Sequence, residues 1–466
     1  MVTTLGIAFG VIFLIVVLFR RDLFPLFVAV TVPFQSAAMF SVGGFFLSPF
    51  HFAAIVACGI LLLHAITRVR LGAPRLASFP ARSLLVLYAI GALLVTALSP
   101  TLFNGLRVFS PTRSLDSQLG NTTALAFTSS NVAQLIYLFL GLGVALYLAR
   151  SVRNAELLAL AFWVGIAFGY LRMGLRGIGL ESSLDLLLDN RTDRNYSVFE
   201  SRARGSFSEP SDFGTFMLVA AVYFTIRALH GTSARVRISS FLGAILASVC
   251  VVLSGSGTTL IATPIVVVLI LAWGAFSAIR MRTFRLAPSY FFVGLFLVAA
   301  LGVNLGTIVS NLTSGLASKV DSNSFLVRSA ADVNAVETFF DTLGLGAGLG
   351  SIRASGFAAT QLGSVGVVGF LLLLIAFVVL TLSALKQPGF VAAGGALVAI
   401  VVAKSIAGPD LSTPLLWMLI GVTMAANLAV HAKPIAATNS DIDRDLVGPD
   451  DFGPTTPAGL RGEPRS

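Results

Sequence analysis

The sequence is built from repeated apolar stretches, each about 18 residues or longer, separated by polar connections. A helix of about 20 residues spans the hydrocarbon core of a bilayer, which is about 30 Å thick. No water reaches the backbone in that core, so each stretch has to satisfy its own hydrogen bonds as an α-helix. Apolar residues make up 56% of the chain, against roughly 45–50% in soluble domains. We therefore predict an all-α fold, a polytopic bundle of transmembrane helices.

The chain divides into a transmembrane domain, residues 1–430, and a tail, residues 431–466. The tail has five prolines and no apolar periodicity, which predicts disorder. The first apolar stretch lacks the basic start and the cleavage site of a signal peptide, so it is predicted to remain as an anchor. The domain has about 13 predicted spans, with a range of 12–14: 3–19, 23–43, 50–66, 83–99, 130–149, 155–171, 213–229, 239–254, 258–279, 288–306, 357–384, 390–407 and 411–430.

Along the chain, short connections rich in basic residues alternate with connections of mixed charge, and this pattern predicts the orientation in the membrane. Cytoplasmic loops of membrane proteins carry an excess of lysine and arginine. The long connections 100–129, 172–212 and 307–356 mix both signs of charge and are predicted outside, together with the N-terminus. The tail is predicted inside. The short basic connections contain Arg20 and Arg21; Arg68, Arg70, Arg75 and Arg82; Arg150 and Arg153; Arg235 and Arg237; Arg280, Arg282 and Arg285; and Lys386.

The net charge of +10 does not indicate nucleic acid as a partner, because much of it is this arginine excess beside anionic lipid headgroups. Cys58 and Cys250 lie inside predicted spans without the spacing of metal ligands, so they are interpreted as packing residues. Arginine is commoner than lysine and alanine is abundant, which is typical of GC-rich bacterial genomes. We expect a protein of a bacterial plasma or inner membrane, in contact with its lipids.

Arg202 and Arg204 precede the 213–229 span on the predicted outer side, where the bias toward cytoplasmic arginine does not explain them. Two interpretations are open. The arginines pair with local carboxylates, an arrangement that contributes only about 0–1 kcal/mol when exposed. Alternatively they bind an anion, because a guanidinium donates two parallel hydrogen bonds to phosphate. The local carboxylates are Glu200, Glu209 and Asp212.

The predicted outer loop 307–356 contains an amphipathic helix from Val327 to Asp341, followed by closely spaced glycines. Arg328, Asp332 and Glu337 belong to the polar part of this helix. The glycines lack the spacing and the preceding strand of a dinucleotide-binding motif. They predict a flexible, tight turn in which backbones approach closely.

Other polar features allow two interpretations each. His51, at the outer end of a span, is an interfacial anchor or an acid–base group. Lys404 lies inside a span near Asp410, and an intramembrane charge is either functional or extends to the headgroups. Arg353 is solvated or contacts a sugar or diphosphate. Residues 254–259 form a tight turn with small-residue packing, or contact phosphate.

Residues 200–370 carry a family resemblance. Its motifs are R-x-x-G-S-F-x-x-P at 202–210, LSGSGTTL at 253–260, an arginine-bearing outer loop, GLGAGLGS at 344–351 and LGSVGVVGF at 362–370. In their order and predicted topology they resemble the O-antigen ligase and Wzy-type polysaccharide polymerase superfamily. The resemblance implies a GT-C-like membrane glycosyltransferase that uses glycans carried on polyprenyl diphosphate at the outer face of the membrane, without a metal or other cofactor.

The resemblance further implies that the chain polymerises or ligates glycan repeat units during surface or exopolysaccharide synthesis. Family arginines hold the diphosphate. Arg202 matches the first of them and Arg328 the second, so we predict that both border one outer cavity. The implied partners are the lipid-linked glycan, a glycan or lipid acceptor, a flippase and a chain-length regulator.

The chain departs from the ligase pattern at Ser355 and Gly356, where ligases have a His-Asn pair. This departure favours a polymerase. The acceptor hydroxyl still needs a base, and Glu209 is the favoured candidate, with a helix cap as its other interpretation. Asp332 and Glu337 are further candidates for the base. The predicted substrate-binding residues are Arg204, Asp332, Glu337, Arg353 and Lys404.

Two other classes of function remain open. A lipid-linked glycan flippase or transporter fits the many spans and the intramembrane Lys404, although the chain has no internal repeat and no matching pair of interrupted segments. A non-catalytic partner in polysaccharide assembly fits the missing histidine.

The alternation of basic connections leads to a prediction on topology. In a chain with a single introduced cysteine, an impermeant thiol reagent applied from outside should label a site near Asp321 and leave a site near Arg237 unlabelled. The opposite labelling pattern would show that the orientation is inverted.

Overall fold

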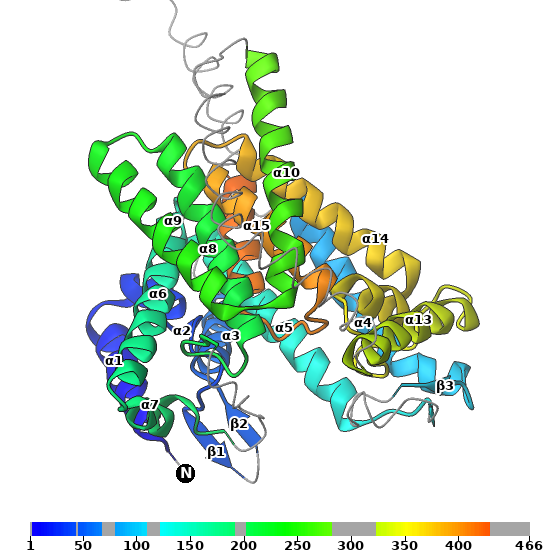
Figure 1. The fold of residues 1–466 in the computed structure, drawn as a ribbon. Helices are drawn as coiled ribbons and strands as arrows, with labels where there is room; N and C mark the ends of the chain where they lie inside the picture. The colour runs from blue at the N-terminus through cyan, green and yellow to red at the C-terminus, as the bar shows by residue number, and fades with distance from the viewer. Residues whose placement is uncertain are drawn as a thin grey trace, which may run out of the picture.

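The computed structural model describes residues 2–42, 45–67, 80–109, 122–191, 202–281 and 323–428, and most of these are helical (Figure 1). The strands form two antiparallel hairpins, in which β1 (Phe40–Val42) pairs with β2 (Phe45–Leu47) and β3 (Arg107–Val108) pairs with β4 (Thr123–Ala124). The helices are α1 (Thr4–Phe19), α2 (Phe24–Thr31), α3 (Pro49–Thr67), α4 (Pro80–Leu102), α5 (Ser129–Ser151), α6 (Glu156–Gly177), α7 (Glu181–Leu188), α8 (Pro210–His230), α9 (Ala234–Ser254), α10 (Gly257–Met281), α13 (Asn323–Asp341), α14 (Phe357–Leu385), α15 (Val391–Ile406) and a last helix, Pro414–Leu428.

Among the described residues, eight helices are long and apolar enough to cross a membrane: α3, α4, α5, α6, α8, α9, α10 and α14. Three shorter apolar helices, α1, α15 and Pro414–Leu428, accompany them. Large hydrophobic side chains such as Leu62, Val268 and Val368 are more than 60% exposed on the outside of the bundle. Such exposure suits lipid as the surrounding solvent. The prediction of a helical, multi-pass membrane protein is confirmed.

The predicted span 23–43 is wrong over its second half. Helix α2 ends at Thr31, and the chain then continues without helical structure to strand β1. Pro33 contributes to the early end, since proline has no backbone N–H with which to continue the helical hydrogen-bond pattern. The predicted helix 327–341 is confirmed within α13. The predicted span 288–306 and the tail 431–466 lie outside the described residues.

The bundle has two ends of different character (Figure 1). We call the end that carries the β1–β2 hairpin, α7 and α13 the hairpin face. The opposite end, the turn face, carries the short turns 152–155, 231–233 and 386–390. Contacts between these turns define it: the Ala155 N–H donates to the Gly389 carbonyl at 3.2 Å, and Arg227 pairs with Glu156. Several of the predicted cytoplasmic arginines, Arg153 and Arg235 among them, belong to this end.

Helix α8 lies at the centre of the bundle. Of its most apolar stretch, 72% is buried, a larger share than in any other candidate span among the described residues. It packs against α6, α9, α10 and α15, and Gly214 allows Ser254 and Thr259 to approach its backbone. Small residues at such crossings are typical of membrane helix pairs. The first turn of α8 reaches the hairpin face and thereby fixes Asp212 there.

Helix α14 is interrupted at Gly366, which has φ +68° and ψ −173°. The loop before the helix folds back against this break: the Val367 N–H donates to the Gly344 carbonyl at 3.0 Å, and the Ala347 and Gly348 N–H groups donate to the carbonyls of Gly363 and Ser364, both at 2.8 Å. The predicted close approach of backbones is confirmed. Residues 346–349 of this loop are buried, whereas Leu345 is 52% exposed, and the flexibility of the turn stays a prediction.

The break in α14 should tolerate no side chain. A Cβ atom on Gly366 would lie 2.2 Å from the Gly344 carbonyl oxygen, and the positive φ adds strain for any other residue. We expect Gly366→Ala to lower the melting temperature in detergent by the equivalent of about 2 kcal/mol or more. The control is Gly91→Ala in α4, where the added methyl group meets no atom within 4 Å. Equal melting temperatures for both variants would contradict the observed packing.

Candidate functional site

A polar cavity of about 100 Å³ lies at the hairpin face, between the first turns of α3 and α8 and the end of α15. Its wall contains charged and neutral polar side chains from segments far apart in the sequence. Its lining residues are Gln35, Phe46, Ser48, His51, Tyr137, Arg191, Asp212, Thr215, Phe216, Ile400, Lys404, Ala407, Gly408, Asp410, Ser412, Thr413, Pro414 and Leu415.

Lys404 is the buried cation of this cavity. It comes from the last turn of α15 and is only 4% exposed. Its ammonium group donates to Thr413 Oγ1 at 2.7 Å and lies 5.5 Å from the centroid of the Phe357 ring. Asp410 and Asp212 act on it electrostatically. A buried charge requires such partners, since its transfer from water is otherwise unfavourable. The structure thus places Lys404, a predicted substrate-binding residue, in the cavity wall.

Arg191 is the second cation, and the sequence analysis did not single it out. It follows α7, is 8% exposed, and its guanidinium carbon lies 5.9 Å from the centroid of the Phe46 ring. The ring face provides a cation–π contact. The argument that singled out Arg202 applies equally to Arg191. Both belong to a predicted outer loop, where the cytoplasmic excess of basic residues does not explain an arginine.

The neutral part of the wall is formed around His51, in the first turn of α3. Its Nδ1 atom and Ser48 Oγ are 2.7 Å apart, a hydrogen bond that orients the imidazole ring. The ring is 4.9 Å from that of Tyr137 on α5. Gln35 adds an amide to the same cavity. Of the two interpretations of His51, the position in a polar cavity favours an acid–base group over an interfacial anchor.

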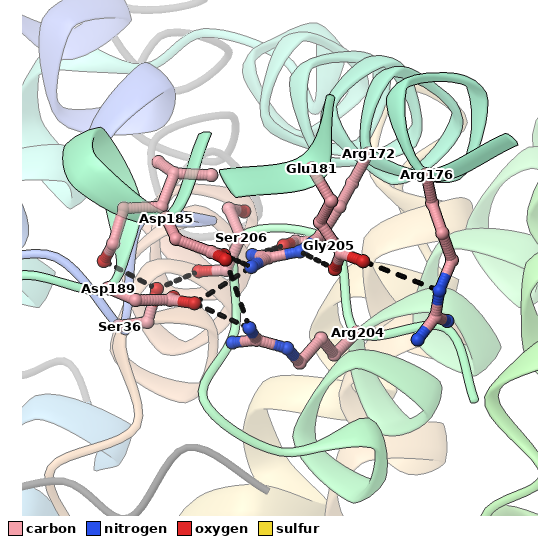
Figure 2. Close-up of polar contacts among 10 residues, drawn as sticks. Ser36, Arg172, Arg176, Glu181, Asp185, Asp189, Arg204, Gly205 and Ser206 are labelled. Atoms are coloured by element: carbon pink, nitrogen blue, oxygen red, sulfur yellow. Dashed lines mark hydrogen bonds and ion pairs between the residues drawn. The ribbon is translucent and has the colours of Figure 1, made fainter. Parts of the chain in front are cut away.

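Beside the cavity, α6 and α7 are joined by a compact ionic network (Figure 2). Arg172 is 3% exposed and donates through Nε to Glu181 at 2.9 Å, through Nη2 to Asp189 at 2.7 Å and to Asp185, and through Nη1 to the Gly205 carbonyl at 2.8 Å. Arg204 also binds Asp185 and Asp189. Burial and the neighbouring Asp189 raise the pKa of Asp185, while the two arginines act in the opposite direction.

The network distinguishes between the two interpretations of Arg204 in the 202–210 motif. Arg204 is held by carboxylates of α7, which agrees with local pairing, although its partners are different from those available next to it in the sequence. Ser206 Oγ donates to the Pro33 carbonyl at 2.7 Å, and Ser36 Oγ donates to the Ser206 carbonyl at 2.9 Å. The motif therefore joins α7 to the segment that follows α2.

Arg202 is placed at the end of α9. Its Nε donates to the Ser254 carbonyl at 2.9 Å, and the next residue, Ala203, donates its N–H to the Leu253 carbonyl at 3.0 Å. A guanidinium suits the last carbonyl groups of a helix, where the backbone dipole is negative. Burial lowers the pKa of Arg202, and Glu209 offsets part of this effect. Arg202 lines a second, much smaller cavity together with Arg172, Arg176 and Arg204.

Glu209 lies at the start of α8, and Asp332, in the middle of α13, contacts the start of α14. Glu209 occupies the N-cap position of α8, is exposed, and accepts a hydrogen bond from Ser211 at 3.0 Å, without a side-chain bond to the helix backbone. Asp332 of α13 accepts from the N–H groups of Ser355 and Gly356 at 2.7 and 3.0 Å. Its carboxylate thus stabilises the N-terminus of α14.

The remaining predicted residues point to the surface. Arg328 and Glu337 on α13 are exposed, and so is Arg353 in the turn before α14. The backbone N–H of Arg353 donates to the Phe109 carbonyl at 2.9 Å. Arg202 lines the smaller cavity, and Arg328 is not among the lining residues of either described cavity. Of the predicted site residues, only Lys404 lines the larger cavity.

No protein-family model and no curated protein matches this sequence. The chemical possibilities of the site therefore follow from its residues. Two cations, Arg191 and Lys404, share the cavity with Asp212, Asp410 and His51. The cations suit a phosphate or carboxylate ligand, while the carboxylates and the imidazole are candidates for proton transfer.

The ionic network should matter for stability. Arg172→Met removes the most buried cation of the network and leaves Asp189 with Arg204 and Glu181 with Arg176, so the cost lies below the about 3–5 kcal/mol of a buried pair that loses one partner completely. We therefore expect a clearly lower melting temperature in detergent. The matched control is Arg20→Met, which removes an exposed pair with Asp22 and should leave the melting temperature unchanged. Equal melting temperatures for the two variants would show that the network does not contribute to stability.

Proposed function

We propose that the chain is a membrane glycosyltransferase that transfers a glycan carried on polyprenyl diphosphate, as a polysaccharide polymerase or as a ligase. The observation that supports it best is the polar cavity, which combines Arg191 and Lys404 with carboxylates and an imidazole at one end of a membrane bundle. A lipid-linked substrate reaches such a site from the bilayer. The family resemblance of residues 200–370 supports the same function.

In this proposal the donor diphosphate binds between Arg191 and Lys404. Breaking the bond between the anomeric carbon and the phosphate oxygen leaves negative charge on the diphosphate. Fixed cations stabilise that charge as it develops, and they do so more strongly in a site that excludes water. This assignment replaces Arg202 and Arg328 as the diphosphate ligands, because neither lines the cavity.

The acceptor hydroxyl attacks the anomeric carbon and gives up its proton. A base in contact with that hydroxyl assists the step. The cavity offers His51, Asp212 and Asp410 for this role, whereas Glu209 is exposed at the start of α8 and is not one of its lining residues. His51 is the favoured candidate because Ser48 orients its ring. Unlike Asp212 and Asp410, it has no negative charge that attracts Lys404.

The proposal includes the orientation and the partners. The hairpin face is the outer face, the N-terminus lies outside, and residues 288–306 complete a topology of about 13 spans with a cytoplasmic tail. The reaction takes place at the outer face of a bacterial plasma or inner membrane. Its acceptor is a glycan or a lipid, a flippase supplies the donor, a chain-length regulator acts on the product, and no cofactor takes part.

Besides the many spans and the intramembrane Lys404, the break in α14 favours a transporter, since interrupted helices bind ions or substrates in many transporters. The carbonyl groups of Gly363 and Ser364 near this break accept hydrogen bonds from Ala347 and Gly348. Groups engaged in this way do not line a pathway. The transporter therefore stays the second interpretation.

Transfer activity tests the proposal. Purified protein in nanodiscs is given a polyprenyl-diphosphate oligosaccharide, and the products are identified by mass spectrometry. We expect Arg191→Met and Lys404→Met to lower turnover by about 10²–10³, the typical effect of losing one fixed charge-stabilising donor. The matched control is Lys386→Met, which removes a lysine from the turn face and should retain wild-type turnover.

One result would refute this function, and another would refute the assignment of its site to the cavity. The first is that the wild-type protein forms no product from any lipid-linked glycan while it moves that lipid between leaflets, which would establish a flippase. The second is full turnover by both cavity variants at wild-type folding, which would place the reaction elsewhere.

A further inference from the structure

The ionic network lies immediately before Arg191 in the chain. Helix α7 ends at Leu188, Asp189 caps its end, and Asn190 connects it to Arg191 in the cavity wall. The last residue of α7 and the two that follow are each held by a hydrogen bond or ion pair to another segment. These contacts fix the backbone immediately before Arg191, which itself lies outside a helix.

Each of these three residues has a defined partner. The Leu188 carbonyl accepts from Ser36 Oγ at 3.1 Å. Asp189 is 7% exposed in its side chain and accepts from Arg172 at 2.7 Å and from Arg204 (Figure 2). The Asn190 amide forms a double contact with Ala38, accepting from its N–H at 2.7 Å and donating to its carbonyl at 3.1 Å.

The charges of the network balance internally. Arg172, Arg176 and Arg204 face Glu181, Asp185 and Asp189, so three guanidinium groups meet three carboxylates. Its arginines are already engaged with carboxylates, which argues for a role in holding the chain instead of binding the ligand.

A fixed backbone matters for Arg191 because its side chain is long. Ordering such a side chain costs up to about 2 kcal/mol of rotamer entropy, and an unfixed backbone adds to this. An arginine that is already in place when the diphosphate arrives binds it more strongly than one that has to be ordered. The contact of Arg191 with the Phe46 ring, 5.9 Å from its centroid, fits a side chain ordered before binding.

We infer that Arg172 is a positioning residue, which acts through Asp189 to hold Arg191 in the cavity for the anionic part of the donor. Arg204 assists it through the same carboxylate. The inference rests on the proposed function, because it assigns the donor diphosphate to Arg191. It predicts that the network and Arg191 contribute to donor binding as one unit.

A double-mutant cycle tests whether the network and Arg191 act on donor binding as one unit. Asp189→Asn keeps the shape of the side chain and removes its charge, and Arg191→Met removes the guanidinium. The measured quantity is the KM for a polyprenyl-diphosphate disaccharide in nanodiscs. In the wild-type background we expect Asp189→Asn to raise KM about tenfold; in the Arg191→Met background we expect no further rise. The control, Glu156→Gln, breaks an ion pair of the same type at the turn face and should leave KM unchanged.

Independent effects would overturn the inference. If Asp189→Asn raises KM by the same factor with and without Arg191, the network acts on general stability and not through this arginine. Arg172→Lys gives a second check, since a lysine retains the charge but not the fork that reaches Asp189, Glu181 and Gly205 together. Its KM should rise and its kcat should fall, because a displaced Arg191 holds the donor and stabilises the developing charge less well.

A measurement without substrate separates this inference from the proposed function. In a chain with Cys58→Ala and Cys250→Ala, a nitroxide spin label is attached through Arg191→Cys. Adding Asp189→Asn should increase the mobility of the label in the EPR spectrum. Unchanged mobility overturns the positioning role whether or not the protein transfers glycans. Absence of glycan transfer together with increased mobility refutes the proposed function and retains the positioning of residue 191.

Discussion

Near a lipid bilayer, backbone groups that leave the helical pattern need partners from the protein itself, and most unusual features of this fold meet that requirement. After α2, the chain between Pro33 and Ala38 is paired by Ser206 and Asn190. The break in α14 is paired by the loop around Gly346. The ends of α9 and α14 are capped by Arg202 and Asp332. These pairings connect segments distant in the sequence and build the hairpin face, where the polar cavity lies.

The arginines of the hairpin face divide into two groups by what they contact. Arg172 and Arg204 bind carboxylates of α7, and Arg202 binds the end of a helix. Arg191 lies in the cavity wall beside an aromatic ring. The 202–210 motif thus contributes to the site indirectly, by fixing the elements around it, although the family resemblance assigned one of its arginines, Arg202, to the diphosphate.

The class of fold was predictable from the sequence because apolar length is a direct consequence of bilayer thickness. The helix at α13 followed equally well from its amphipathic pattern. The half-length α2 was missed because the apolar composition continues beyond Pro33 while the helix does not. In the site, Lys404 was found because a charge within an apolar stretch is conspicuous. Arg191 and the placement of His51 and Lys404 in one cavity were not, since they depend on how segments more than a hundred residues apart come together.

The surroundings of Lys404 have a consequence for the order of events at the cavity. Its ammonium group is already attracted by Asp212 and Asp410, so an entering diphosphate competes with the protein's own carboxylates for the same cation. On the proposed function, the diphosphate pairs with the ammonium, and Asp212 and Asp410 lose that partner. Arrival of the ligand is then an exchange of ion partners at Lys404.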